Sequence, residues 1–337
     1  MEILVTGAAG YIGSHTMLEL LNAGYIPIAL DNFSNSSCES LKRVEKLAGK
    51  SFKIYECDIL DRSGLEKIFK NHNIEAVIHF AGLKAVGESN EIPLKYYLNN
   101  VNGSVVLFEV MEKFNCKKLV FSSSATIYGD NVSPFDETMP TGNVTNPYGR
   151  TKFIIEEILF DLQKSDVSWS IALLRYFNPI GAHESGQIGE DPAGVPNNLM
   201  PYISQTAVGK RPHVNVFGDD YETHDGTGVR DYIHVTDLAL GHLSAIEFVS
   251  KNVGIEAINL GTGIGYSVFD AIKAMEKASG KKIDYKVAPR REGDLGEVYA
   301  NPAKALSLLG FRTTRGIDKM CEDAWRWQSE NPDGYNC

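Results

Sequence analysis

Short apolar runs rich in branched residues alternate with longer amphipathic stretches over the first half of this chain. The runs lie at residues 3–5, 26–30, 52–55, 76–80, 119–121 and 170–174. Strands that are apolar on both faces and separated by helices form parallel sheets, so the alternation predicts an α/β fold with a doubly wound parallel sheet. Ligands bind such sheets beyond the carboxyl ends of the strands, and functional side chains are expected just after each run.

A glycine-rich segment follows the first run, with glycines at Gly7, Gly10 and Gly13. Glycines let the backbone turn tightly and approach a diphosphate at the start of the next helix. The G-x-x-G-x-x-G spacing differs from G-x-G-x-x-G, and alone it also fits a simple turn. Asp31 closes the second run, where a carboxylate accepts hydrogen bonds from ribose hydroxyls and repels a 2′-phosphate. Together these residues predict a Rossmann-type site for NAD.

Polar residues also follow the later runs. Asp58 closes the third run and fits two roles, the N-cap of a helix over 59–70 or a contact to adenine. His79 lies inside an apolar run and is expected to be a core histidine. The serine run 122–124 ends the fifth strand, which places Ser124 near the glycine segment, although any one serine also fits a cap.

Tyr148 and Lys152 are four residues apart at the start of a helical pattern. Residues with this spacing share one helix face, so a phenol and an ammonium would lie side by side. The cation is expected to lower the pKa of Tyr148 and make it a usable base, with the Ser124 hydroxyl on the same oxygen. The spacing is common by chance and also fits a solvated helix face, but its position after the serine run favours proton transfer.

The helix that carries Tyr148 has more apolar residues than a single stripe, at positions 153–155, 158, 159 and 162. Burial in the core of one chain explains this pattern. Packing against the same helix of a second chain explains it as well, because a two-fold interface needs one self-complementary patch. A homodimer is therefore expected.

Charge and cysteine content limit the partners. A net charge of −10 argues against nucleic acids and anionic membranes as partners, and no run of 18 apolar residues predicts a membrane span. The first residues enter a strand pattern without a basic leader, so a cytoplasmic protein is expected. Five scattered cysteines, at positions 38, 57, 116, 321 and 337, predict reduced thiols and no metal site.

Four longer motifs resemble the extended short-chain dehydrogenase/reductase family and, within it, the enzymes that epimerise UDP-sugars. They are 80–88 (FAGLKAVGE), 121–129 (FSSSATIYG), 174–178 (LRYFN) and 226–234 (GTGVRDYIH), and the resemblance extends to position 333. It implies interconversion of UDP-galactose and UDP-glucose with permanently bound NAD, as part of galactose metabolism. Tyr148 would remove the proton of the sugar 4-hydroxyl, Ser124 would bridge that oxygen, and Lys152 would hold the nicotinamide ribose. The 4-keto sugar would then turn over and be reduced on its other face.

The same resemblance implies the ligand contacts and the division of the chain. The cofactor contacts, beside the glycines, are Tyr11, Ile12, Asp31, Asn32, Asn35, Ser36, Asp58, Ile59, Phe80, Ala81, Gly82, Lys84, Asn99, Ser122, Tyr148, Lys152 and Phe177. The contacts to the UDP-sugar are Lys84, Ser124, Tyr148, Asn178, Asn198, Leu199, Asn215, Val216, Phe217, Arg230, Arg291, Asp294 and Val298. Residues 1–177 and about 231–260 would bind NAD, and about 178–230 and 261–337 would form a smaller mixed α/β domain for the UDP-sugar.

Three positions refine the expected substrate and reaction. Related dehydratases carry an acidic pair directly after the hydroxyl residue of the fifth strand, whereas this chain has Ala125 and Thr126, so elimination lacks its acid and base. Some bacterial epimerases close the sugar pocket with a tyrosine where this chain has Val298, which predicts room for the N-acetyl group of UDP-GalNAc and UDP-GlcNAc. An epimerase for a UDP-uronic acid and a non-catalytic NAD sensor stay as alternatives.

Overall fold

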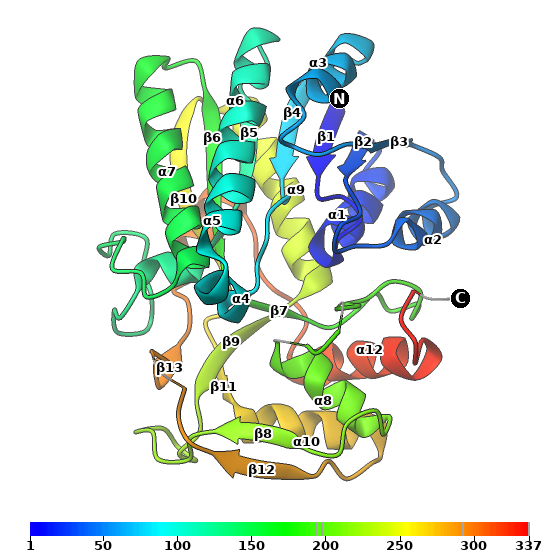
Figure 1. Cartoon of the computed structure of the whole chain (residues 1–337), viewed down its shortest axis with the longest axis vertical. Coiled ribbons are helices and arrows are strands. Elements are labelled where there is room, and N and C mark those ends of the chain that lie inside the picture. The colour runs from blue at the N-terminus through cyan, green and yellow to red at the C-terminus, as the bar shows by residue number, and fades with distance from the viewer. Residues whose placement is uncertain (193, 197, 292, 336–337) are drawn as a thin grey trace.

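The computed structural model describes residues 1–192, 194–196, 198–291 and 293–335. Figure 1 shows two parts, a parallel sheet covered by helices and a smaller group of strands and helices that lies below the sheet in this view. Within the described residues, no helix is long and apolar enough to cross a membrane.

The larger part is built on a seven-stranded parallel sheet in the order β10-β6-β5-β4-β1-β2-β3. The order turns back between β1 and β4, which is the switch point at which doubly wound sheets bind ligands. The predicted α/β fold is therefore confirmed. The strands are β1 (Glu2–Thr6), β2 (Ile26–Asp31), β3 (Lys53–Glu56), β4 (Ile74–His79), β5 (Lys118–Ser124), β6 (Ser170–Tyr176) and β10 (Gly254–Leu260).

Apolar residues on both sides of the strands form two separate cores. Val5, Ile78 and Leu174 pack on one face of the sheet, while Leu4 and Val77 pack on the other. Because neighbouring residues of a strand point to opposite faces, unbroken apolar runs fill both layers. The exception is β3, where three of the four residues are exposed. The expectation that every run is apolar on both faces is wrong for this strand, since it lies at the edge of the sheet.

Helices cover both faces of the sheet, and α7 is the longest of them among the described residues (Figure 1). They are α1 (Tyr11–Asn22), α2 (Cys38–Ala48), α3 (Arg62–Asn71), α4 (Val86–Glu91), α5 (Pro93–Tyr96), the π-helix η1 (Tyr97–Asn102), α6 (Gly103–Lys113), the 3₁₀-helix η2 (Ala125–Tyr128), α7 (Pro147–Ser165), α9 (Val235–Lys251) and α11 (Ala303–Leu309).

Among the described residues, the smaller part contains a mixed four-stranded sheet, a two-stranded sheet and three helices around their own apolar core. Its elements are β7 (Asn178–Ile180), β9 (Val229–His234), β11 (Gly265–Ser267), β13 (Glu297–Val298), β8 (Val214–Phe217), β12 (Tyr285–Ala288), α8 (Leu199–Ala207), α10 (Val268–Ser279) and α12 (Ile317–Glu330). The chain returns to the main sheet in β10, beside β6. Residues 231–234, expected in the NAD-binding part, pair instead with β7 and β11 in the smaller part.

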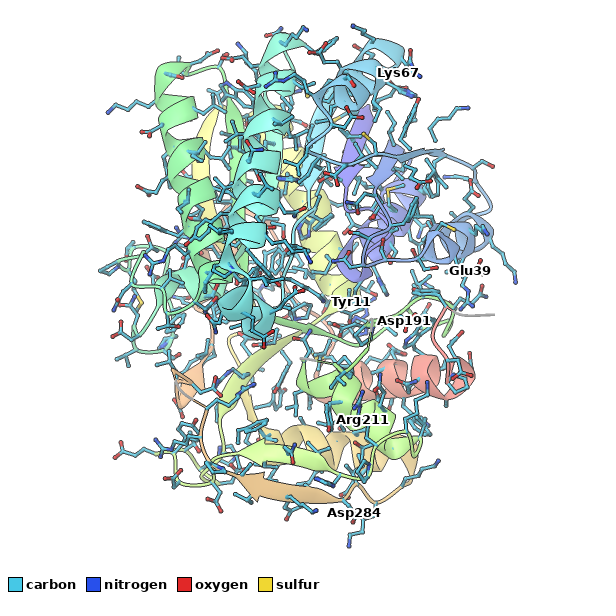
Figure 2. The ribbon with its side chains drawn as sticks, viewed as in Figure 1. Tyr11, Glu39, Lys67, Asp191, Arg211 and Asp284 are labelled. Atoms are coloured by element: carbon cyan, nitrogen blue, oxygen red, sulfur yellow. The ribbon has the colours of Figure 1, made fainter. Side chains whose placement is uncertain are left out.

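Side chains join the two parts at the carboxyl edge of the main sheet. In Figure 2, Tyr11 and Asp191 lie where the parts meet, and the Tyr11 hydroxyl donates a hydrogen bond of 2.7 Å to the Gly181 carbonyl. The first turn of α1 is thereby tied to the segment after β7.

Candidate active site

The carboxyl ends of the central strands form one edge that carries the predicted functional residues. The register pairs Thr6 with Leu30 on one side and with His79 on the other. On the neighbouring strands Ser124 pairs with Tyr176. The strands therefore end together, and the segments that follow them meet above the sheet.

The glycine segment forms a tight turn between β1 and α1. Gly7 has φ +69°, and a Cβ at this residue would lie 2.8 Å from the backbone nitrogen of Ala81. A Cβ at Gly13 would lie only 2.2 Å from the Gly7 carbonyl oxygen. Gly10 is the N-cap of α1, and no side chain caps this end of the helix. The helix start thus has no side-chain cap, which suits the diphosphate that we expect there.

Asp31 connects the glycine segment to the loop after β2. Its Oδ2 accepts a hydrogen bond of 2.9 Å from the Ala9 amide, and its Oδ1 accepts one of 2.8 Å from the Ser36 hydroxyl. Asn32 donates to Asp58 Oδ2 at 2.8 Å. The structure therefore brings together four of the predicted cofactor contacts, which lie on two loops of the same edge.

Asp58 does not cap a helix over 59–70. The helix α3 begins at Arg62, and its N-cap is Asp61, whose side chain accepts from the Gly64 amide. Asp58 accepts a hydrogen bond of 2.8 Å from the Leu60 amide instead and closes a turn before the helix. The capping interpretation is wrong because this turn delays the helix by three residues.

The segment after β4 contacts both parts of the molecule. Lys84 Nζ lies 3.2 Å from Glu190 Oε1, and Asn198 donates to the same oxygen at 2.9 Å. His79 is buried between the Thr6 and Ser104 hydroxyls, and burial lowers its pKa to about 3. It is a neutral core histidine, as expected.

The other predicted cofactor contacts lie around the same edge. Ile12 is in the first turn of α1, Asn35 is exposed beside Ser36, Ile59 is almost completely buried, and Phe80, Ala81 and Gly82 follow β4, while Asn99 lies in η1 and Phe177 is buried after β6.

Tyr148 and Lys152 lie in the first two turns of α7. The helix is capped by Asn146, whose side chain accepts a hydrogen bond of 2.8 Å from the Gly149 amide, and Pro147 occupies the first turn. Lys152 Nζ donates a hydrogen bond of 2.6 Å to the Ser122 carbonyl. The helix thus places the ammonium against the serine run of β5.

The pKa of Tyr148 moves in the direction opposite to our expectation. Burial raises it, and a hydrogen bond with Ser124 opposes the rise. Lys152 does not lower it here, because its ammonium points to the Ser122 carbonyl. Burial lowers the pKa of Lys152 to about 8, and Glu156 opposes that shift. The surrounding protein alone therefore keeps the Tyr148 phenol protonated. It also lowers the pKa of Lys152 so far that the ammonium is close to losing its proton near neutral pH.

The predicted sugar-nucleotide contacts from Asn178 onward lie in the smaller part. Asn178 begins β7, Asn198 is the N-cap of α8, and Leu199 is the first residue of that helix. In β8, Asn215 is half-buried and Phe217 is exposed, but Val216 is completely buried in the core of the smaller part. The whole residue is therefore closed to a ligand in this structure, contrary to the predicted contact at Val216.

Two arginines of this region share one carboxylate. Arg291 Nε lies 2.7 Å from Asp294, and Arg230 Nη2 lies 3.8 Å from it. Arg291 also lies over the Phe217 ring, 5.0 Å from its centre. The geometry groups positive charge beside an aromatic ring, an arrangement that suits a nucleoside diphosphate.

Val298 lies beside the end of β5. It packs, half-buried, in a small apolar cluster with Ala125, Phe177 and Leu295. In β13 it pairs with Arg230 of β9. The cluster joins the segment next to Ser124 with the arginine-bearing strand, so Val298 lies between the serine run and the positive group.

Comparison with known proteins agrees with this geometry. The model of the NAD dependent epimerase/dehydratase family matches residues 3–261. The chain belongs to this family. It is 60% identical over 336 residues to the UDP-glucose 4-epimerase of Bacillus subtilis, covering 99% of both chains, and 59% identical over 341 residues to that of Mus musculus, covering 99% of this chain and 98% of the other. The crystal structure of the Bifidobacterium longum UDP-glucose 4-epimerase in complex with NAD⁺ and UDP superimposes with a TM-score of 0.96 at 52% identity, over 99% of this chain and 100% of that chain.

Several polar residues of this family member were not found from its sequence. Glu156 and Arg175 form a buried ion pair of 2.7 Å behind the site, and the Ser123 hydroxyl donates to Glu156. Glu190 links Lys84 to Asn198. The sequence signal for Glu156 is its position four residues after Lys152 on the same helix face.

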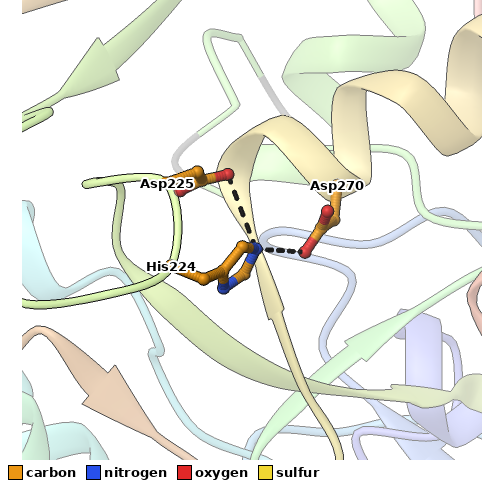
Figure 3. Close-up of side chains that lie close together, drawn as sticks. All are labelled: His224, Asp225 and Asp270. Atoms are coloured by element: carbon orange, nitrogen blue, oxygen red, sulfur yellow. Dashed lines mark ion pairs between the residues drawn. The ribbon is translucent and has the colours of Figure 1, made fainter.

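One group of side chains lies close enough together to bind a metal ion within the described residues, namely His224, Asp225 and Asp270 (Figure 3). The carboxylates already have structural partners. Asp225 accepts from Thr227 and from the Ser267 hydroxyl, and Asp270 accepts from the Ser267 amide in a capping box. We interpret the cluster as the anchor of α10, with His224 as an exposed ion-pair partner. Cys38, Cys57, Cys116 and Cys321 are free thiols, and Cys337 lies outside the described residues.

Proposed function

We propose that this protein is an NAD-dependent UDP-glucose 4-epimerase that interconverts UDP-galactose and UDP-glucose. The observation that carries the proposal is the meeting of Tyr148, Lys152 and Ser124 at one sheet edge with a glycine turn, in a chain about 60% identical over its full length to proteins of that activity. Ala125 and Thr126, directly after Ser124, leave elimination without an acid and a base.

The residues at the edge fit NAD. The uncapped start of α1 and the turn at Gly7 leave room for a diphosphate, and Asp31 stands at the end of β2 for the ribose hydroxyls. Bound NAD would supply the acceptor, and then the donor, of the hydride at sugar carbon 4, and its positive ring would favour the Tyr148 phenolate. Lys152 would hold the nicotinamide ribose.

Three side chains would move and hold the proton. Tyr148 would take it from the sugar 4-hydroxyl and return it to the oxygen after the 4-keto sugar has turned over. Ser124, which shares a hydrogen bond with Tyr148, would hold that oxygen in line. In this structure the ammonium of Lys152 points to the Ser122 carbonyl, so it would favour the deprotonated phenol only after turning toward Tyr148.

The smaller part would bind the UDP group. Arg230 and Arg291 would hold the diphosphate, with Asp294 and Asn215 beside the nucleoside. The NAD-binding part would comprise 1–177 and about 235–260, because residues 231–234 pair within the smaller part, and most of the remainder would bind the UDP-sugar. Val298 packs next to Ala125 and Phe177, and valine occupies less space there than the tyrosine that some bacterial epimerases carry. We therefore propose that the sugar pocket also accepts the N-acetyl group of UDP-GalNAc and UDP-GlcNAc.

We propose a homodimer that forms through the helices beside α7. Leu94 and Leu98 are 81% and 58% exposed, and Phe160 on α7 is 39% exposed. These residues lie on α5, η1 and α7, which contact one another, and we propose that their exposed apolar side chains meet those of a second copy across a two-fold axis. Light scattering should show a dimer that Leu94→Glu with Leu98→Glu converts to a monomer. A wild-type monomer at micromolar concentration contradicts this proposal.

Free thiols at the four described cysteines support a reducing compartment, the cytoplasm, as the location. The test of function uses purified NAD-loaded protein and UDP-galactose, without added reductant. Formation of UDP-glucose, detected with a coupled UDP-glucose dehydrogenase, supports the proposal. Turnover of UDP-glucuronic acid alone would assign a uronic acid epimerase, and no turnover of either sugar by folded protein would favour an NAD sensor.

A further inference from the structure

A third ionisable residue, Glu156, continues the face of α7 that carries the proposed site. Tyr148, Lys152 and Glu156 are spaced by four residues, so their side chains follow one another along one side of the helix. Lys152 is 5% exposed and Glu156 is 1% exposed. A carboxylate is rarely buried to this extent without partners, and its place next to Lys152 calls for an explanation.

Glu156 is held in a fixed position by residues of two strands. Arg175 on β6 donates from Nε to Oε1 at 3.1 Å and from Nη2 to Oε2 at 2.7 Å, which is a two-pronged contact. Ser123 on β5 donates to Oε1. Ser123 lies between Ser122, whose carbonyl accepts from Lys152, and Ser124 of the proposed site.

Arg175 is itself fixed from the other side. Its Nη1 donates to the Tyr128 hydroxyl at 3.1 Å, and its guanidinium lies over the Tyr128 ring, 5.0 Å from the ring centre. Tyr128 in turn donates to Asn259 on β10 at 2.7 Å. A continuous set of polar contacts thus runs from β10 to α7 beneath the proposed site.

Stability alone does not account for this arrangement. A buried ion pair is on average no better for stability than well-packed apolar residues, because desolvation offsets the attraction. The pair also occupies the layer in which the apolar core of this face is otherwise continuous. Its position four residues from Lys152 points to a role in the site.

The charges around Lys152 show what this role is. The ionisable groups closest to Lys152 in this arrangement are Tyr148 and Glu156 on the same face of α7 and His79 on β4, while the hydroxyl of Tyr176 on β6 contacts Ser122 and Arg175 on β6 pairs with Glu156. Burial lowers the pKa of His79 to about 3, and burial raises the pKa of Tyr148 and of Tyr176, so these three are neutral near pH 7. Of this set, Glu156 supplies the negative charge. Burial lowers the pKa of Lys152 to about 8 even with Glu156 present, so a further decrease would leave much of the lysine uncharged near neutral pH.

We propose that Glu156, fixed by Arg175 and Ser123, is a positioning residue that keeps Lys152 in its charged form beside Tyr148. Lys152 can favour the Tyr148 phenolate only while it is protonated. The Arg175 contacts keep Glu156 ionised and prevent it from turning away. This proposal rests on the assignment of Lys152 to the site under the proposed function.

The test is the titration of Lys152 in NAD-loaded protein labelled with ¹³C at the lysine ε-carbon. The Lys152 resonance is identified by its loss in Lys152→Met, and its midpoint is followed from pH 5 to pH 11. We expect Glu156→Gln to lower the midpoint by about one pH unit or more, since it removes a nearby opposite charge and keeps the shape of the side chain. The pH above which kcat/KM for UDP-galactose falls should drop by the same amount.

Two matched variants separate charge from shape. Glu156→Asp keeps the charge on a shorter side chain and should leave the midpoint within a few tenths of a unit of wild type. Ser123→Ala removes one neutral contact but leaves the charge of Glu156 and both Arg175 contacts, so it should shift the midpoint by less than Glu156→Gln does. Equal midpoints in Glu156→Gln and wild type overturn the proposal, and so does an Asp variant that shifts as far as the Gln variant.

A second neutral variant covers the case in which Glu156→Gln does not fold, because that change leaves the charge of Arg175 buried without its carboxylate. Glu156→Gln with Arg175→Met removes both charges and is also expected to lower the midpoint. An unchanged midpoint in folded double variant contradicts the proposal. Since the titration needs no turnover, a protein that fails to epimerise UDP-galactose but shows the expected shift refutes the function and leaves the positioning role standing.

Discussion

Gly13→Ala tests whether the glycine turn is fixed by backbone contact. The new methyl group would lie 2.2 Å from the Gly7 carbonyl oxygen and 2.9 Å from Ala8 Cα, and all of these atoms belong to the backbone. Alanine favours a helix over glycine by about 1 kcal/mol, whereas a group forced into a packed site costs about 1–3 kcal/mol. Backbone atoms cannot swing aside as a side chain does, so we take the upper end of the cost and expect a net loss of about 2 kcal/mol.

The control is Gly87→Ala in α4, where an added Cβ meets no atom within 4 Å. This variant should be as stable as wild type or more stable by up to about 1 kcal/mol. Urea unfolding of NAD-free protein gives both free energies, and NAD released on denaturation gives the cofactor content. We expect Gly13→Ala to bind NAD at least tenfold more weakly, because displacement of Gly7 widens the turn at the start of α1. Equal stability and equal NAD content in the two variants would refute the reasoning.

Three further outcomes are expected. Tyr148→Phe keeps the ring and removes the proton-transferring oxygen, so kcat for UDP-galactose should fall by about 10²–10⁴, and a loss of only a few-fold contradicts the assigned role. Val298→Tyr should reduce turnover of UDP-GalNAc at least tenfold and that of UDP-galactose by less, and equal losses would place Val298 outside the sugar pocket. Contacts with His234 and Lys319 lower the pKa of Asp323 from 3.8 to about 2, so its contribution to stability is full above pH 4 and is lost as the pH falls toward 2. The difference in unfolding free energy between wild type and Asp323→Asn should therefore shrink from pH 4 to pH 2, and a constant difference counts against the shift.

The strands and the glycine turn were predictable because their signals are local. Apolar runs identified six strands of the main sheet, and three glycines marked the turn before α1. Element boundaries were less certain, as Asp58 and Asp61 show. Both are followed by helix-forming residues, and the choice between them depends on a turn that Asp58 makes with the Leu60 amide. The helix propensities of these residues do not show whether that turn forms.

Contacts between distant residues were not predictable. Glu156 on α7 gives no sign of its partner, because Arg175 belongs to a strand 19 residues later and only the fold brings the two together. The predicted direction of the pKa shift of Tyr148 was wrong for the same reason, since that direction depends on burial and on where the Lys152 ammonium points. Spacing on one helix face shows which side chains are neighbours, but not which of them form a contact.

The cations of the proposed site fall into two groups that differ in how readily they can change partners. Lys84 with Glu190 and Arg291 with Asp294 are pairs in which the cation is 60% and 55% exposed. Such pairs contribute about 0–1 kcal/mol, so a diphosphate can take over either cation at little cost. Arg175 and Glu156 are both buried, and separating the two side chains would leave a buried charge without water or a charged partner. The exposed pairs are therefore suited to bind and release ligands during turnover, while the buried pair holds the charge beside Lys152 constant throughout.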